Sequence, residues 1–82
     1  MAKVIIYTTS WCPHCEMLRK FLRMNKIKYT EYDVEENNAK WKEGLKKSGG
    51  KDVVPIIDID GKILMVNFND VLVKQLKRAL KL

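Results

Sequence analysis

Apolar residues follow two different periods along this chain, which predicts a protein built from both strands and helices. Residues 4–7 form a continuous β-branched and aromatic run, typical of a strand buried on both faces. A loop over residues 8–11 follows it. From Pro13 to about Asn25 the apolar residues recur at helical spacing. Proline costs little at the first helical position, because its missing N–H would have been unpaired there.

The rest of the chain repeats these two patterns between turn residues. Further strands are predicted over residues 28–34, 53–59 and 62–66, with Asp60-Gly61 as a tight turn between the last two. Helices are predicted to begin at Asn37 or Asn38 and at Asn69 or Asp70, and Gly49-Gly50 ends the first of them. The predicted order is β-α-β-α-β-β-α, with right-handed crossovers between parallel strands.

The same periods predict which residues of the later elements are buried. The expected inward-facing residues are Trp41, Leu45, Leu72, Leu76 and Leu80. Asp58 interrupts an otherwise apolar strand. We expect its carboxylate to face water at the edge of the hairpin.

Length and composition predict a single globular domain spanning residues 1–82. The chain has 82 residues, of which 46% are hydrophobic and 32% are charged, a balance that excludes disorder. No apolar stretch reaches transmembrane length, so no membrane partner is expected. The apolar run near Met1 is too short for a signal peptide, and we expect a cytoplasmic protein.

The formal net charge is +6. Two interpretations remain open: solvated helix faces, or a surface that attracts an acidic partner. Nucleic-acid binding is not expected, because no known binding motif accompanies the charge.

The two cysteines of the chain lie at the start of the first predicted helix, in the run Cys12-Pro13-His14-Cys15. Residues at i and i+3 of a helix are about 5–6 Å apart, which a disulfide tolerates. A structural staple is disfavoured, because so short a loop gains little from closure. A metal site would normally need four ligands, and only His14 could join the thiols. Redox chemistry is therefore the favoured interpretation.

Order, length and motifs resemble the glutaredoxin branch of the thioredoxin fold over essentially the whole chain. The resemblance is carried by Trp11-Cys12-Pro13-His14-Cys15, by Val53-Val54-Pro55 and by Asp60-Gly61-Lys62. It implies a four-stranded mixed sheet flanked by three helices and a cis peptide before Pro55. It also implies disulfide exchange with glutathione as co-substrate and no bound cofactor or metal. Unlike ordinary thioredoxins, the chain has Ile6 in place of a buried aspartate.

Several positions depart from the family pattern. His14 replaces a tyrosine, Met65-Val66 or their neighbours replace a glycine pair, and Asn69-Asp70 is what remains of an Asp-Asp pair. Thr8 or Thr9 stands where a basic residue is common. Each departure removes an anchor for glutathione carboxylates.

Disulfide exchange needs a thiolate, so Cys12 is expected to be the ionised nucleophile. Backbone N–H groups of His14 and Cys15 in the first helical turn, which begins at Pro13, would stabilise it. A protonated His14 would add to this, unless its side chain is an exposed residue that tunes nothing. Cys15 is then the resolving thiol, less exposed and less acidic than Cys12.

Five more residues are candidates for substrate or glutathione binding. Pro55 in a cis bond would present the backbone of Val54 to an extended substrate, or it is an ordinary proline at a strand edge. Trp11 belongs either to an apolar substrate platform or to the core. Asn69 and Asp70 hold a ligand's α-amino group or are plain helix caps.

We therefore predict a monomeric dithiol–disulfide oxidoreductase that maintains cell redox homeostasis by electron transport to protein disulfides and glutathione mixed disulfides. The nearest alternative is a glutaredoxin-like thioredoxin substitute, recharged by thioredoxin reductase and donating electrons to ribonucleotide reductase. A different class of protein is a metal or iron–sulfur carrier in which two chains share the ion through Cys12. A pure interaction module is the remaining possibility.

Overall fold

The computed structural model describes residues 3–50, 54–65 and 69–81. Its elements follow the predicted order. They are β1 (Val4–Thr8), α1 (Pro13–Met24), β2 (Thr30–Asp33), α2 (Asn38–Lys47), β3 (Ile56–Ile59), β4 (Lys62–Leu64) and α3 (Asp70–Leu80). The predicted strand ends at Val53 and Val66 lie outside the described residues.

One mixed sheet with the strand order β2-β1-β3-β4 organises the molecule. Strand β1 runs parallel to β2 and antiparallel to β3, and β4 pairs with β3 in a hairpin. The registers Tyr7–Tyr32 and Ile6–Ile57 place β1 and β3 at the centre. Both central strands are therefore covered on two faces, as the continuous apolar run of β1 predicts.

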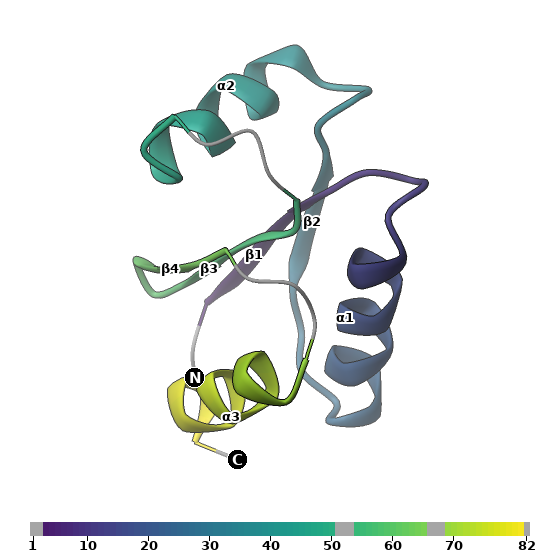
Figure 1. The fold of residues 1–82 in the computed structure, drawn as a ribbon, viewed down its shortest axis with the longest axis vertical. Coiled ribbons are helices and arrows are strands. Elements are labelled where there is room, and N and C mark those ends of the chain that lie inside the picture. The colour runs from purple at the N-terminus through teal and green to yellow at the C-terminus, as the bar shows by residue number, and fades with distance from the viewer. Residues whose placement is uncertain (1–2, 51–53, 66–68, 82) are drawn as a thin grey trace.

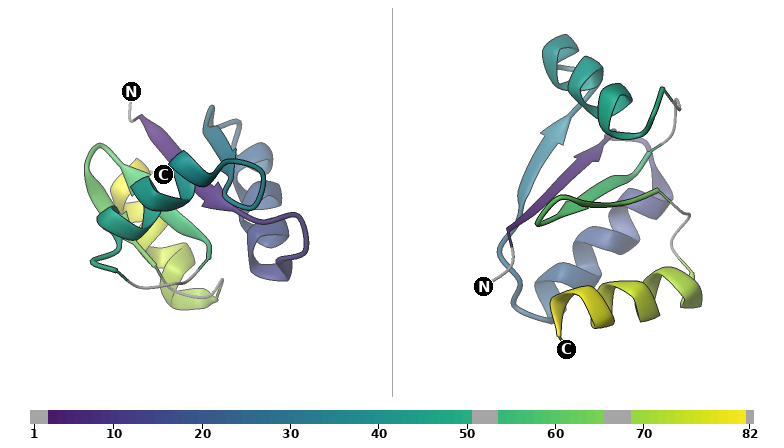
Figure 2. Two further views of the ribbon diagram at one scale, coloured as in Figure 1. Left: turned by 90° about the horizontal axis from the view of Figure 1, so that it is seen from above. Right: turned by 90° about the vertical axis from the view of Figure 1, so that its left-hand side faces the viewer.

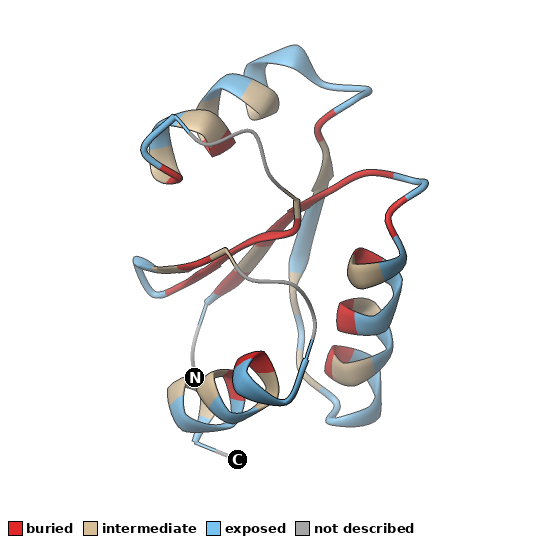
Figure 3. Ribbon diagram, viewed as in Figure 1, coloured by how far each residue is buried: buried red, intermediate tan, exposed pale blue. Residues whose placement is uncertain are grey.

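Helices cover both faces of this sheet (Figures 1 and 2). Helix α2 lies on one face, and α1 and α3 lie on the other. The larger core lies under α1 and α3 and includes Ile6, Leu18, Ile57 and Leu72. The smaller core under α2 is built around Tyr7, Val34 and Ile56. Buried residues accordingly follow β1, β3 and the inward faces of the helices in Figure 3.

Helix α1 forms where the sequence supplies a start, one apolar face and an end. Cys12 is the N-cap residue, Pro13 is the first helical residue, and Cys15, Leu18 and Leu22 are buried on the inward face. After Asn25 the chain turns at Lys26, whose φ of 55° is left-handed, and the helix ends.

The other two helices begin at asparagine caps. Asn37, rather than Asn38, accepts a hydrogen bond from the Lys40 amide at 3.1 Å. Asn69, rather than Asp70, accepts one from the Leu72 amide at 3.0 Å. These bonds satisfy N–H groups that a helix leaves unpaired at its start.

The expected buried faces are confirmed for Leu72 and Leu76, which are fully buried. Leu80, Trp41 and Leu45 are only half-buried. Leu80 lies in the last turn of α3, where the end of the helix leaves part of its side chain uncovered.

The expectation that Asp58 faces water is wrong. Strand β3 lies inside the sheet, and Asp58 points toward α2, where it is 9% exposed. Its carboxylate accepts hydrogen bonds from Lys47 at 2.7 Å and from the Gly61 amide at 2.7 Å. The sequence alone places Asp58 at an edge. In the structure β3 has a neighbouring strand on each side and α2 lies over the Asp58 side chain, so this residue is buried.

Candidate active site

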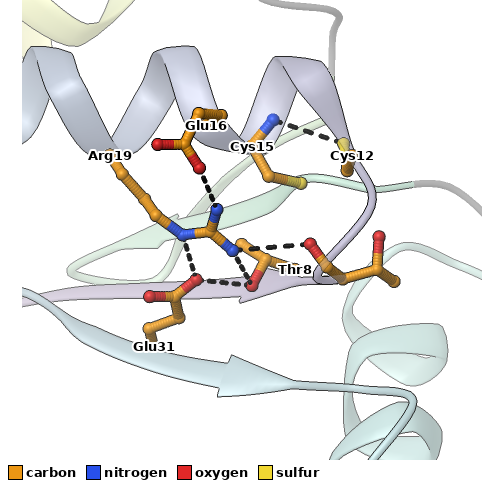
Figure 4. A network of polar contacts seen from close by, with 7 residues as sticks. Thr8, Cys12, Cys15, Glu16, Arg19 and Glu31 are labelled. Carbon is orange, nitrogen blue, oxygen red and sulfur yellow. Dashed lines mark hydrogen bonds and ion pairs between the residues drawn. The ribbon is translucent and has the colours of Figure 1, made fainter.

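The two thiols lie at the N-terminal tip of α1, and both are free. The Cys15 amide donates a hydrogen bond to the Cys12 sulfur at 3.2 Å (Figure 4). This contact is one of the two backbone contacts expected from the sequence. It places a backbone dipole against the sulfur that starts the helix, where negative charge is favoured.

Cys15 is the more deeply buried of the pair. Its exposed fraction is 0%, compared with 5% for Cys12. Burial and the proximity of Cys12 raise the pKa of Cys15 to about 12, although the Thr9 backbone and the charge of Arg19 oppose them. The inner thiol therefore holds its proton firmly, which suits a group that reacts only after the outer one has formed a bond.

Between the two cysteines, Pro13 is exposed and His14 is half-buried. Pro13 opens the helix as predicted. The electrostatic effect of His14 on Cys12 stays a prediction.

The Val54-Pro55 peptide bond is cis, which confirms the expectation drawn from the family resemblance. Pro55 is buried and Val54 is half-buried. Both precede β3, so the central strand next to β1 begins beside this bond.

A core role for Trp11 is wrong, because its side chain is 67% exposed. Trp11 and Trp41 both border an apolar hollow of about 290 Å³, here named the tryptophan hollow. The remaining lining residues are Thr9, Val34, Glu35 and Val54. Its lining includes Trp11, which directly precedes Cys12, and Val54, which directly precedes Pro55. This position agrees with an apolar platform for a substrate.

Asn69 and Asp70 lie at the exposed start of α3. Asn69 acts as the helix cap, so the plain interpretation of this residue is confirmed. A role for either residue in holding an α-amino group stays a prediction.

Sequence reasoning missed one residue of this site, Arg19. Its guanidinium lies beneath the motif and donates hydrogen bonds to the Thr8 hydroxyl at 3.2 Å and to the Thr9 carbonyl at 3.4 Å (Figure 4). Thr8 and Thr9 are the positions where the family often carries a basic residue, so here the positive charge comes from α1. The sequence contained one indication of this role. Arg19 is a cation one helical turn after Cys15, on the same apolar face of α1 as Leu18 and Leu22.

Within residues 3–50, 54–65 and 69–81, no group of three or more histidine, cysteine or acidic side chains could hold a metal ion. In the same ranges, no helix is long and apolar enough to cross a membrane.

Comparison with known proteins gives a consistent result. The sequence model of the glutaredoxin family matches residues 4–64. A Mycobacterium tuberculosis protein, described provisionally as a glutaredoxin, is 41% identical over 64 residues, which cover 77% of this chain and 76% of that protein. Glutaredoxin 3 of Escherichia coli is 37% identical over 62 residues, covering 76% and 74%.

A solved structure extends the likeness to the fold. The crystal structure of a thioredoxin-like protein superimposes with a TM-score of 0.77 at 26% identity, covering 94% of this chain and 99% of that one.

Proposed function

The chain belongs to the glutaredoxin family and is a thiol–disulfide oxidoreductase, and from this premise we propose that it reduces protein disulfides and glutathione mixed disulfides through Cys12 and Cys15. The observation that carries the proposal is the pairing of two unlike thiols at the tip of α1. Cys12 accepts a backbone N–H bond at the helix start, and Cys15 lies fully buried one turn below it. Such a pair can divide the work of nucleophile and resolving thiol.

The proposed reaction proceeds in two exchanges. The Cys12 thiolate attacks one sulfur of the substrate disulfide, so that a mixed disulfide forms and the other substrate sulfur leaves as a thiolate. Cys15 then loses its proton and attacks the Cys12 sulfur, which forms the Cys12–Cys15 disulfide and releases the second substrate thiolate. Two electrons pass from the protein to the substrate.

Pro13 and His14 serve Cys12 in this scheme. Pro13 begins the helix that aims backbone N–H groups at the sulfur. His14 would add favourable charge when it is protonated.

Substrates would bind along the tryptophan hollow. An extended polypeptide would pair with the backbone of Val54 before Pro55 and place an apolar side chain against Trp11. Asn69 and Asp70, at the start of α3, would hold an amino group of a ligand such as glutathione.

Glutathione is the proposed reductant, without any bound cofactor, and the protein would work as a monomeric single domain in the cytoplasm. One observation favours a second candidate. Among the residues that the structure describes, the lining of the tryptophan hollow includes the carboxylate of Glu35 and no cation, which disfavours a carboxylate ligand there. Reduction by thioredoxin reductase, with ribonucleotide reductase as an electron acceptor, is therefore the alternative.

Cysteine variants test the proposed roles. We expect Cys12→Ser to abolish reduction of a protein disulfide, because no other thiol in the chain is placed to attack it. Cys15→Ser should still attack and should accumulate a mixed disulfide detectable by mass spectrometry. Accumulation of that adduct on Cys15 in the Cys12→Ser protein, instead, would contradict the assignment.

The reductant is tested separately, by following NADPH consumption with glutathione and glutathione reductase or with thioredoxin reductase. Glutathione as reductant predicts turnover with the first system, and turnover with only the second would establish the alternative.

A further inference from the structure

Arg19 is an almost buried cation next to the resolving thiol. Its side chain is 13% exposed. Arg19 follows Cys15 by four residues on α1, a spacing that puts two side chains on the same helix face. Figure 4 shows the guanidinium and the Cys15 side chain on the same side of the helix, both directed toward the end of β1.

The guanidinium is fixed in place from several directions. It bonds the carboxylates of Glu31 at 2.5 Å and Glu16 at 3.0 Å, in addition to Thr8 and the Thr9 carbonyl. The Thr8 hydroxyl also donates to Glu31 at 2.6 Å. These contacts come from α1, β1 and β2, so the guanidinium is held at one position relative to the sheet.

A fixed charge at this point acts on the ionisation of Cys15. Burial disfavours the Cys15 thiolate most strongly, while the positive charge of Arg19 lowers the pKa of this thiol. Arginine keeps its charge at any working pH. Other charged or titratable groups in this part of the described structure include Cys12, Glu16 and Glu31, with His14 next to Cys15 in the chain and Arg23 and Asp33 at the edge of the same surface.

We propose that Arg19 is a positioning residue for the resolving step, in which its clamped guanidinium stabilises the transient thiolate of Cys15 during attack on the mixed disulfide at Cys12. The inference rests on the proposed function, because it assumes that Cys15 resolves. In that step the proton of Cys15 passes to solvent, the Cys15–Cys12 bond forms and the substrate sulfur leaves as a thiolate. Arg19 exchanges no proton or electron.

The two exchanges can be observed separately with 5,5′-dithiobis(2-nitrobenzoate). Attack by Cys12 releases one coloured thiolate, and attack by Cys15 on the resulting mixed disulfide releases the second. In stopped flow we expect Arg19→Met to slow the second release selectively. Loss of a nearby opposite charge raises a thiol pKa by about 1 or more. The more basic thiolate is a better nucleophile, so a pKa higher by about 1 slows attack only about 3–4-fold.

The matched variants separate charge from structure. Arg19→Lys keeps the charge and should recover most of the second rate, while Arg23→Met, the same change one turn later on α1, should leave both rates unchanged. The pH at which the second rate reaches half its maximum should rise in Arg19→Met and return in Arg19→Lys. Equal slowing of both releases, or an Arg19→Lys protein as slow as Arg19→Met, would overturn the inference.

Failure of the proposed function gives a different result. If Cys15 does not resolve, Cys15→Ser releases as many thiolates as the wild-type protein, and the premise fails. If Cys15→Ser releases one and wild type two, the premise holds, and an unchanged second rate in Arg19→Met overturns the role of Arg19 alone. Should Arg19→Met fail to fold, the second rate of Arg19→Lys can be compared with that of the wild-type protein at several pH values. A half-maximal pH that is higher by 1 or more in Arg19→Lys would contradict the inference, because this variant keeps the charge.

Discussion

The two sulfurs of the site differ in surroundings although they are one helical turn apart. Cys12 occupies the cap position and receives a backbone N–H, while Cys15 faces the core side of α1 without solvent contact. Burial raises the pKa of Cys15 to about 12. The folded protein therefore keeps this thiol neutral over a pH range in which the unfolded chain ionises it.

This difference predicts that the reduced protein loses stability in alkali. A group whose pKa is raised in the folded state stabilises fully below its unfolded pKa, about 8.5 for cysteine, and this stabilisation declines above it toward the folded value. Between pH 7 and pH 10 we expect the free energy of unfolding to fall by on the order of 1–2 kcal/mol through Cys15. Urea unfolding under reducing conditions measures it.

Serine variants supply the control. Cys15→Ser should lack this part of the alkaline loss, whereas Cys12→Ser should retain it. An alkaline loss of the same size in Cys15→Ser would show that another group is responsible.

The sequence did not predict the ion pairs of two residues, and the physical reason is the same for both. Arg19 and Asp58 are charges on otherwise apolar faces, and their partners are distant in sequence: Glu31 and Lys47 lie 12 and 11 residues away. The pattern reveals an unusual position, but only the placement of β2 and α2 supplies the opposite charge. The cysteine pair needs no such information, because its spacing and the helix start lie in four adjacent residues.

At the scale of elements, α2 is attached to the sheet by a polar network as well as by its apolar contacts. Lys47 bonds Asp58 of β3 and lies 5.0 Å from the centre of the Tyr7 ring. The Tyr7 hydroxyl donates to Glu43 at 2.8 Å. Burial opposes ionisation of Asp58, but the hydrogen bonds from Lys47 and Gly61 outweigh it, and the pKa of this carboxyl lies below its ordinary value.

We expect Asp58→Ala to lower the free energy of unfolding by about 2–3 kcal/mol, the upper part of the range for hydrogen bonds to charged groups. Because the folded pKa is lowered, the stabilisation is complete above the unfolded value of about 3.9 and is lost as the pH falls through the folded one. Urea unfolding at pH 7 and near pH 2.5 measures the difference, which should shrink in acid.

A double-mutant cycle with Lys47→Met assigns the effect to this pair. Lys46→Met changes the exposed neighbour on the same helix and should show no coupling to Asp58. Equal coupling of both lysines to Asp58 would contradict a specific ion pair.

The first and last residues of each strand and helix are predicted less accurately from the sequence than its presence. The second strand is predicted over residues 28–34 but is observed over Thr30–Asp33, because only these residues pair with β1. The hydrophobic period identifies a strand, while its ends depend on the length of the neighbouring strand. The sequence offers two adjacent residues for each helix start, Asn37 or Asn38 and Asn69 or Asp70. The side chain that accepts a hydrogen bond from the amide three residues later identifies the cap.

For the whole molecule, order and architecture were accessible from the sequence, since each predicted element is present and the family resemblance implies the mixed sheet. The arrangement of charge was not. Exposed cations lie on both α2 and α3, namely Lys42, Lys46, Lys74, Lys77 and Arg78, and these helices cover opposite faces of the sheet (Figure 2). Among the described residues, exposed positive charge therefore lies on both sides of the sheet, in a chain whose formal net charge is +6.

A spread positive charge predicts salt-sensitive encounter with acidic protein substrates. Screening lengths fall from about 30 Å at 0.01 M salt to about 8 Å at 0.15 M. Over this range we expect kcat/KM for an acidic protein disulfide to fall severalfold, since steering acts on association. A steady-state titration with salt measures it.

A small uncharged disulfide should show little change under the same conditions, and a basic protein disulfide should become a better substrate as salt is added. Identical salt curves for the acidic and basic proteins would refute electrostatic steering.

The exposed position of Trp11 has a practical consequence. One indole stands next to the reacting sulfur, and the second indole of the chain, Trp41, borders the same hollow. Indole emission thus reports on the surroundings of this hollow. We expect it to change when the Cys12–Cys15 disulfide forms or a polypeptide binds there, so that turnover of the unlabelled protein could be followed by its own fluorescence.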